Sequence, residues 1–305
     1  MILHVILFGL WTIIAEIPGI DASAASSSAY VRYLETNTWH FKFNSLEILV
    51  DPVLASPLDF GMPLIYTGKP RVVDGLKELQ DLSVRCNHVL LSQGLDDHAH
   101  TPTLEKLRSL RPSMQYICPQ SAASILQRCG VKDSHITVLN PGESTVISTY
   151  SVEESIEVLA TNGALLGPPW QQKENGYILR NYSQRSRLSS LPSIYYEPHC
   201  MYNDAEISKY QVDYVITPII AQLLPSFTLV DGGQKALRLA ERLGAKYIVP
   251  MANGNLQQSG LLSTLIAKKG TNKEFIDLVN LKSAGKIRVL DVVPGVEIQL
   301  ATTIQ

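Results

Sequence analysis

The stretch that decides the fold runs from residue 87 to residue 107 and reads Asn-His-Val-Leu-Leu-Ser-Gln-Gly-Leu-Asp-Asp-His-Ala-His-Thr-Pro-Thr-Leu-Glu-Lys-Leu. Its apolar run at residues 88–91 predicts a short β-strand that ends before Gly94. Thr101 and Pro102 predict the start of a helix, because a hydroxyl residue followed by proline is typical of a first helical turn. The loop between them carries aspartate and histidine, side chains that bind metal ions. The stretch therefore predicts a strand, a polar loop and a helix in succession.

The chain on either side continues this alternation. Residues 31–50 predict three strands separated by polar turns, and residues 72–79 predict a helix. The second half repeats the progression, with strands between residues 146 and 196 followed by alternating strands and helices. Two β-rich halves, each with one face to cover, predict an α/β protein built as a four-layer αβ/βα sandwich. We predict no domain boundary within residues 30–305.

The N-terminus is set apart by its composition. Residues 2–15 are apolar apart from His4 and Thr12, and Ala22-Ser23-Ala24 follows as a small-residue sequence suited to cleavage. An apolar run of about 14 residues is too short for a stable transmembrane span. We predict that residues 1–29 are a targeting segment and linker. A retained N-terminal helix and a misassigned start are the alternatives.

Composition restricts the classes of partner. The chain is 45% hydrophobic and 18% charged, which is typical of a folded globular protein. Its 26 basic and 28 acidic residues give a net charge of −2, so no bulk attraction to nucleic acid is expected. No cysteine pair has Cys-x-x-Cys spacing, which argues against a zinc ribbon and a redox pair. We predict buried free thiols at all four positions, Cys86, Cys118, Cys129 and Cys200.

Three motifs resemble those of the metallo-β-lactamase superfamily. They are Ile48-Leu49-Val50-Asp51-Pro52, the run from Val89 to His98 with Pro102-Thr103-Leu104 behind it, and Ile248-Val249-Pro250-Met251. The resemblance covers most of residues 31–260. It is closest to the branch of the L-ascorbate-6-phosphate lactonase-like and N-acyl-phosphatidylethanolamine phospholipase D-like hydrolases, and to uncharacterised plant members. It implies a metallo-β-lactamase-like αβ/βα sandwich with a metal site in loops at one edge of the two sheets.

The resemblance implies two metal sites, and the first is predicted to be lost. The family motif Ser/Thr-His-x-His-x-Asp-His has Gln93 and Leu95 at its first two histidines. The third histidine falls near Gly163-Ala164, where no ligand exists. Glutamine is a poor zinc ligand and leucine is none. In the family, Asp51 orients a ligand histidine through a hydrogen bond; with that histidine gone, we predict that Asp51 caps backbone amides.

The second site keeps part of its ligand set. Asp97 and His98 match the family motif, and the segment that usually supplies a bridging aspartate contains Glu197 and His199. We predict one mononuclear site formed by Asp97, His98, His199 and His100, holding one zinc, iron or manganese ion. The alternative is that no metal binds, that Asp97 caps the loop and that His98 donates to a carbonyl. Asp97 is also the candidate catalytic base, although an ordinary carboxylate activates water poorly.

Five further residues are predicted to line a pocket beside this site. Gln93 and Leu95 occupy the lost ligand positions, and Glu197 lies near the predicted metal. Trp170 belongs to a proline-rich loop that the resemblance places at the mouth of the site, where an aromatic ring suits an apolar or planar ligand. Asn253 stands where the family's last histidine is expected. A packed hairpin cover is the alternative role for Trp170.

Two classes of function remain open. A divergent hydrolase would cleave an ester, a lactone or a phosphodiester with at most one metal ion. A non-catalytic member would have kept the fold to bind a small molecule or a protein, or as a scaffold. The ligand count favours binding, whereas the resemblance favours an enzyme. The similar plant proteins suggest a plastid location, with the secretory pathway as the alternative; the sequence leaves the oligomeric state open.

Overall fold

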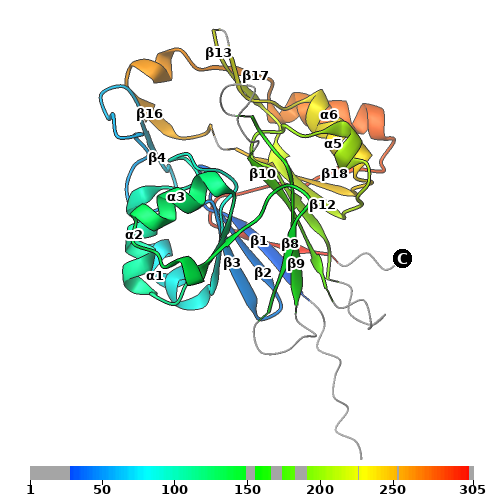
Figure 1. Ribbon diagram of the computed structural model, residues 1–305. Helices are drawn as coiled ribbons and strands as arrows, with labels where there is room; N and C mark the ends of the chain where they lie inside the picture. Colours follow the sequence, from blue (N-terminus) through cyan, green and yellow to red (C-terminus); the bar gives the residue numbers. More distant parts are fainter. Residues whose placement is uncertain are drawn as a thin grey trace, which may run out of the picture.

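A computed structural model shows two large sheets packed face to face, with helices on both outer sides (Figure 1). It describes residues 28–148, 155–165, 174–182, 191–225, 227–252 and 254–301. Most of the predicted targeting segment, residues 1–27, lies outside them. The first strand begins at Ala29, which is fully buried, one residue before the predicted domain start. The predicted four-layer αβ/βα sandwich is confirmed.

The two large sheets have seven strands each. In spatial order the first contains β19 (Glu297–Leu300), β1 (Ala29–Tyr33), β2 (Trp39–Phe43), β3 (Leu46–Val50), β5 (His88–Leu90), β6 (Gln115–Cys118) and β7 (Ile136–Val138). The second contains β18 (Arg288–Val289), β15 (Tyr247–Met251), β12 (Tyr214–Pro218), β11 (Ile194–Tyr196), β10 (Asn175–Asn181), β9 (Ile156–Asn162) and β8 (Ser144–Ile147). Each sheet joins an antiparallel part to a parallel part, and the parallel part begins where β3 pairs with β5 and β11 with β12.

Helices cover the outer face of each sheet. Those on the first sheet are α1 (Gly75–Arg85), α2 (Thr101–Leu110) and α3 (Gln120–Arg128), and those on the second are α4 (Asp204–Ile207), α5 (Gln234–Arg242) and α6 (Asn272–Ser283). The helix predicted at residues 72–79 was placed too early. The Asp74 side chain caps the backbone N–H of Lys77, so the helix begins at Gly75 and extends to Arg85, burying Leu79 and Leu82.

The core between the sheets explains why these strands form. β2 buries Trp39, Phe41 and Phe43, and these side chains meet Tyr177, Tyr196 and their neighbours from the second sheet. The rings of Phe41 and Tyr196 contact each other across the interface at 6.1 Å, edge to face. All four cysteines are buried and free, as predicted.

Two small sheets extend from one end of the sandwich (Figure 1). One contains β14 (Phe227–Val230), β13 (Ala221–Leu224) and β17 (Ala267–Lys269), and the other pairs β16 (Gln257–Ser259) with β4 (Thr67–Lys69). A 3₁₀ helix, η3 (Leu261–Thr264), lies between β16 and β17 in sequence, and another, η1 (Asp133–His135), precedes β7. The sequence did not predict these small sheets. No helix in the described part of the chain is long and apolar enough to cross a membrane.

Candidate functional site

Strand ends from both large sheets meet at the candidate site. Val50 pairs with Leu90 in the parallel register of β3 and β5, so Asp51 and Ser92 leave the first sheet side by side. Tyr196 ends β11 of the second sheet, and Glu197 and His199 follow it. The loop from residue 92 to residue 100 carries Asp97 and His98 into the same space. Parallel strands deliver their carboxyl ends to one edge, which is why residues distant in sequence converge here.

Asp51 is the buried centre of this site. Its Oδ1 accepts the backbone N–H of Ser92 at 2.7 Å, and its Oδ2 accepts the hydroxyls of Ser92 at 2.6 Å and Tyr196 at 2.7 Å. His98 Nδ1 lies 2.8 Å from the same Oδ2. Asp51 has a φ of 42°, a left-handed conformation that aspartate tolerates better than most residues. Asp51 therefore caps a backbone amide, as predicted, and it also holds the ring of His98, which was not predicted.

The other ring nitrogen of His98 faces Asp97. His98 Nε2 lies 3.3 Å from Asp97 Oδ2 and 3.0 Å from Asn37 Nδ2. Burial lowers the pKa of His98, but the charges of Asp97 and Asp51 outweigh burial and raise the pKa to about 10. Burial raises the pKa of Asp97, and the charge of His98 outweighs it and lowers the pKa below the usual value. Without a cation, Asp97 and His98 therefore form an ion pair at neutral pH.

His199 completes the group. Its ring centroid lies 5.2 Å from that of His98, and Gln93 Nε2 lies 2.6 Å from His199 Nδ1. Burial and the charge of His98 lower the pKa of His199 to about 4, so this ring is neutral at neutral pH. The fully buried Glu197 accepts the backbone N–H groups of His199 and Met201, and burial raises its pKa to about 8. Glu197 thus fixes the backbone of His199 from behind.

The geometry suits one divalent cation. Asp97, His98 and His199 each offer a ligand atom, and these atoms all lie within 4.8 Å of one another. One carboxylate and two imidazoles form a donor set that zinc, iron and manganese accept. Because Asp51 accepts the proton on Nδ1, the tautomer that frees Nε2 for a metal is favoured.

Unpaired acceptors support the same assignment. Three buried acceptor oxygen atoms around the site have no hydrogen-bond partner among the described residues: Asn37 Oδ1, Gln93 Oε1 and Asp97 Oδ1. Buried acceptors are nearly always paired, so their concentration at one place points to a cation or a donor that the side chains do not supply.

The remaining predicted residues fall into three groups. His100 lies outside the ligand group and corrects the predicted set, because its Nδ1 contacts Thr103 Oγ1 at 2.8 Å and its Nε2 lies 3.4 Å from Ser56 Oγ. Leu95 lines a cavity above the site together with Asp97 and His199, whereas Gln93 and Glu197 lie buried behind it. Trp170 and Asn253 lie outside the described residues. No ligand side chain stands at Gly163 or Ala164.

That cavity has a volume of about 220 Å³, and much of its lining comes from parts of the chain that the sequence did not identify as site residues. The loop before β4 supplies Leu58, Phe60 and Tyr66, the β13–β14 hairpin supplies Leu224 and Leu229, and the segment around η3 supplies Leu262 and Ile266. The apolar residues of β13 and β14, which flank Pro225, were a usable signal for a hairpin. Asn37 and Tyr196 were also missed, since neither belongs to a recognisable motif.

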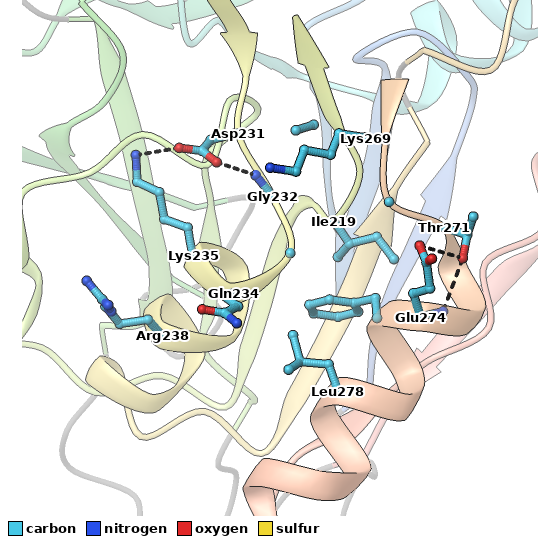
Figure 2. A pocket seen from close by; sticks show the side chains of 14 residues that line it. Ile219, Asp231, Gly232, Gln234, Lys235, Arg238, Lys269, Thr271, Glu274 and Leu278 are labelled. Atoms are coloured by element: carbon cyan, nitrogen blue, oxygen red, sulfur yellow. Dashed lines mark hydrogen bonds and ion pairs between the residues drawn. The ribbon is translucent and has the colours of Figure 1, made fainter. Parts of the chain in front are cut away.

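Two other places in the molecule resemble sites but lack this geometry. His40, Glu47 and Cys86 also bring ligand atoms together, but Arg85 Nε lies 3.0 Å from Glu47 Oε2 and already neutralises it. A larger cavity of about 640 Å³ lies between the N-terminal ends of α5 and α6 (Figure 2). Its Lys235 pairs with Asp231 at 3.1 Å, and none of the sequence-predicted site residues lines it.

Comparison with known proteins agrees with the fold and the motif order. The family model of the β-lactamase superfamily domain matches residues 30–252. A comparison with curated protein sequences finds no significant match. Three solved structures share the fold at low identity.

The metallo hydrolase Igni18 from Ignicoccus hospitalis is 16% identical, with a TM-score of 0.60 over 91% of this chain and 100% of that one. An isothiocyanate hydrolase from Delia radicum gut bacteria is 15% identical, with a TM-score of 0.60 over 90% and 100%. CmlA, a diiron β-hydroxylase from Streptomyces venezuelae, is 15% identical, with a TM-score of 0.60 over 90% of this chain and 54% of that one. These likenesses establish the fold, and the family match covers most of the chain. The chain therefore belongs to the metallo-β-lactamase superfamily.

Proposed function

We propose that the chain is a hydrolase that uses one divalent cation, held by Asp97, His98 and His199, to cleave an ester, a lactone or a phosphodiester. One observation carries the proposal: three ligand atoms converge within 4.8 Å beneath a cavity, and Asp51 orients one of them. A bound zinc, iron or manganese ion would lower the pKa of a water molecule and polarise the bond to be cleaved.

The chain's own residues prepare this chemistry. Asp51 keeps the proton on Nδ1 of His98, so a cation would displace the proton on Nε2 and bind that nitrogen. The lowered pKa of Asp97 keeps it anionic, which suits a ligand and makes it a weak general base. The lowered pKa of His199 keeps its imidazole neutral at neutral pH, so one of its two ring nitrogens has a free lone pair for a metal.

A second candidate is a binding protein without catalysis, and one observation favours it. Asp97 pairs with His98, and Gln93 contacts His199, so the group can satisfy much of its own bonding without a cation. Gln93 also stands where the superfamily motif has a metal ligand. In this case the cavity would hold a small molecule and the polar floor would orient it.

Metal analysis of the purified full chain separates the two candidates. After dialysis against zinc, iron or manganese, the hydrolase proposal expects close to one metal ion per chain by mass spectrometry. Asp97→Ala, His98→Ala and His199→Ala should each lose it. His100→Gln is the matched control, since His100 is a neighbouring buried histidine outside the group, and it should retain the metal. Wild-type protein without metal, and with a melting temperature that a chelator leaves unchanged, overturns the hydrolase.

The plastid location is also a proposal, supported by the resemblance to plant members and by the composition of the first residues. A fluorescent reporter fused behind residues 1–35 tests it. Accumulation in the secretory pathway or the cytosol contradicts it.

A further inference from the structure

The cavity above Asp97 and His199 has a polar floor, formed by these two residues, and apolar walls. Its walls include Leu58, Phe60, Leu224, Leu229, Leu256 and Leu262. Leu58 and Leu256 are buried, whereas Phe60 is 39% exposed and stands nearer the solvent. Two aromatic rings, Phe60 and Tyr66, lie 5.7 Å apart in this wall. Burial of the apolar part of a ligand against such a lining is favourable, while the few polar groups at the floor orient the ligand.

Charge is distributed unevenly around this cavity. Among its described lining residues, Asp97 is the one carboxylate, and neither lysine nor arginine is present. Two cations on neighbouring segments are directed to backbone carbonyls: Arg71 Nη2 donates to Leu256 O at 3.0 Å, and Lys268 Nζ donates to Gly254 O at 2.7 Å. An anionic group that enters the cavity would lose its hydration without gaining a cationic side chain.

We propose that the site selects a neutral substrate with a short alkyl or aryl substituent, such as a neutral ester or lactone, and discriminates against phosphodiesters and other anions. This inference narrows the proposed function and rests on it only in treating the ligand as a substrate, because the selectivity itself comes from the cavity walls. The volume of about 220 Å³ limits the substituent to a small one, below the range of typical drug-sized pockets.

Calorimetry with chain-matched ligands tests the selectivity without catalysis. Hexanamide, hexanoate and hexyl phosphate share one alkyl chain and differ in charge. We expect hexanamide to bind the chelator-treated full chain at least tenfold more tightly than either anion. From butanamide to hexanamide the affinity should rise by up to about fourfold per methylene, the full transfer value. Equal or tighter binding of an anion to chelator-treated protein, or no binding of any amide, overturns the proposal.

One variant and one control assign the effect to the cavity wall. Leu229→Arg introduces a cation at a half-buried wall position outside the main core clusters, and should reverse the preference in favour of hexanoate. Leu64→Arg adds the same charge at a residue that is 91% exposed and does not line the cavity, and should leave the preference unchanged. Circular dichroism confirms folding. A Leu229→Arg protein that is folded yet still prefers hexanamide contradicts the assignment.

Activity then separates this inference from the proposed function. Metal-loaded protein should hydrolyse p-nitrophenyl hexanoate and leave bis(p-nitrophenyl) phosphate intact. If hexanamide binds selectively but no metal binds and no ester is cleaved, the hydrolase fails and the neutral-ligand cavity stands. If the phosphodiester is cleaved in preference to the ester, the hydrolase stands and the inference fails.

Discussion

Replacing Asp51 with asparagine should lower the free energy of unfolding by about 2–4 kcal/mol and prevent stable metal binding. Asp51 accepts four hydrogen bonds at 2.6–2.8 Å from Ser92, His98 and Tyr196, and it is completely buried. Asparagine has one acceptor oxygen, so in either orientation its amide nitrogen faces a buried donor. An unsatisfied buried donor costs about 1–3 kcal/mol, and exchanging charged for neutral acceptors adds about 1 kcal/mol.

Asparagine is the most informative replacement for Asp51 because of the backbone conformation at this position. Asp51 has a φ of 42°, and asparagine tolerates this left-handed conformation about as well as aspartate. The variant therefore changes the side chain's chemistry and adds little backbone strain, which alanine would not achieve. Urea denaturation monitored by tryptophan fluorescence gives the free energy of unfolding, and competition with a chelating dye gives metal affinity.

The control for this prediction removes one donor and keeps the carboxylate. Tyr196→Phe deletes one hydrogen bond to Asp51 and should cost about 1–2 kcal/mol, less than the asparagine variant, with metal binding retained. If the free energy of unfolding of Asp51→Asn lies within about 0.5 kcal/mol of wild type, which is the scatter of neutral substitutions, Asp51 does not organise the site. Unchanged metal affinity in that variant refutes its role in orienting His98.

Three other predictions follow from the same contacts. Gly94→Ala should cost about 1–3 kcal/mol by denaturation, because its new Cβ would meet the backbone of Ser121 at 2.6 Å; wild-type stability contradicts this. Gln93→Glu should raise metal affinity about tenfold in the dye assay, because a carboxylate beside His199 Nδ1 would fix its tautomer; weaker binding contradicts this. In chelator-treated protein, stability should fall as pH rises from about 6.5 towards 10, because Glu197 near pH 8 and His98 near pH 10 lose protons in the fold that the unfolded chain has already lost. His98→Asn should abolish the decline above about pH 8 in a pH series of melting temperatures, and persistence of that decline would assign it to another group.

Local sequence signals recovered much of the sandwich. The apolar strands at residues 39–43 and 46–50 end in the structure where the sequence predicts, because hydrophobic runs and turn residues are local properties. The helix after Thr101-Pro102 also begins as predicted. The helix before it was placed too early, since its start depends on a single capping contact of Asp74. The hairpin of β13 and β14 was missed, although it forms a wall of the cavity.

The sequence by itself determined the family, the order of elements and the candidacy of Asp97, His98 and His199, because motifs and periodicity are written along the chain. Only the tertiary structure decided which histidines meet. His199 lies 106 residues from its contact Gln93 and still joins His98, while His100, two residues from His98, turns towards Thr103. The tertiary structure also places Asp51 in contact with His98, and among the described residues it places no lysine or arginine in the lining of the cavity. These properties depend on how two sheets pack and where their strands end, and spacing along the chain does not specify distances across that interface.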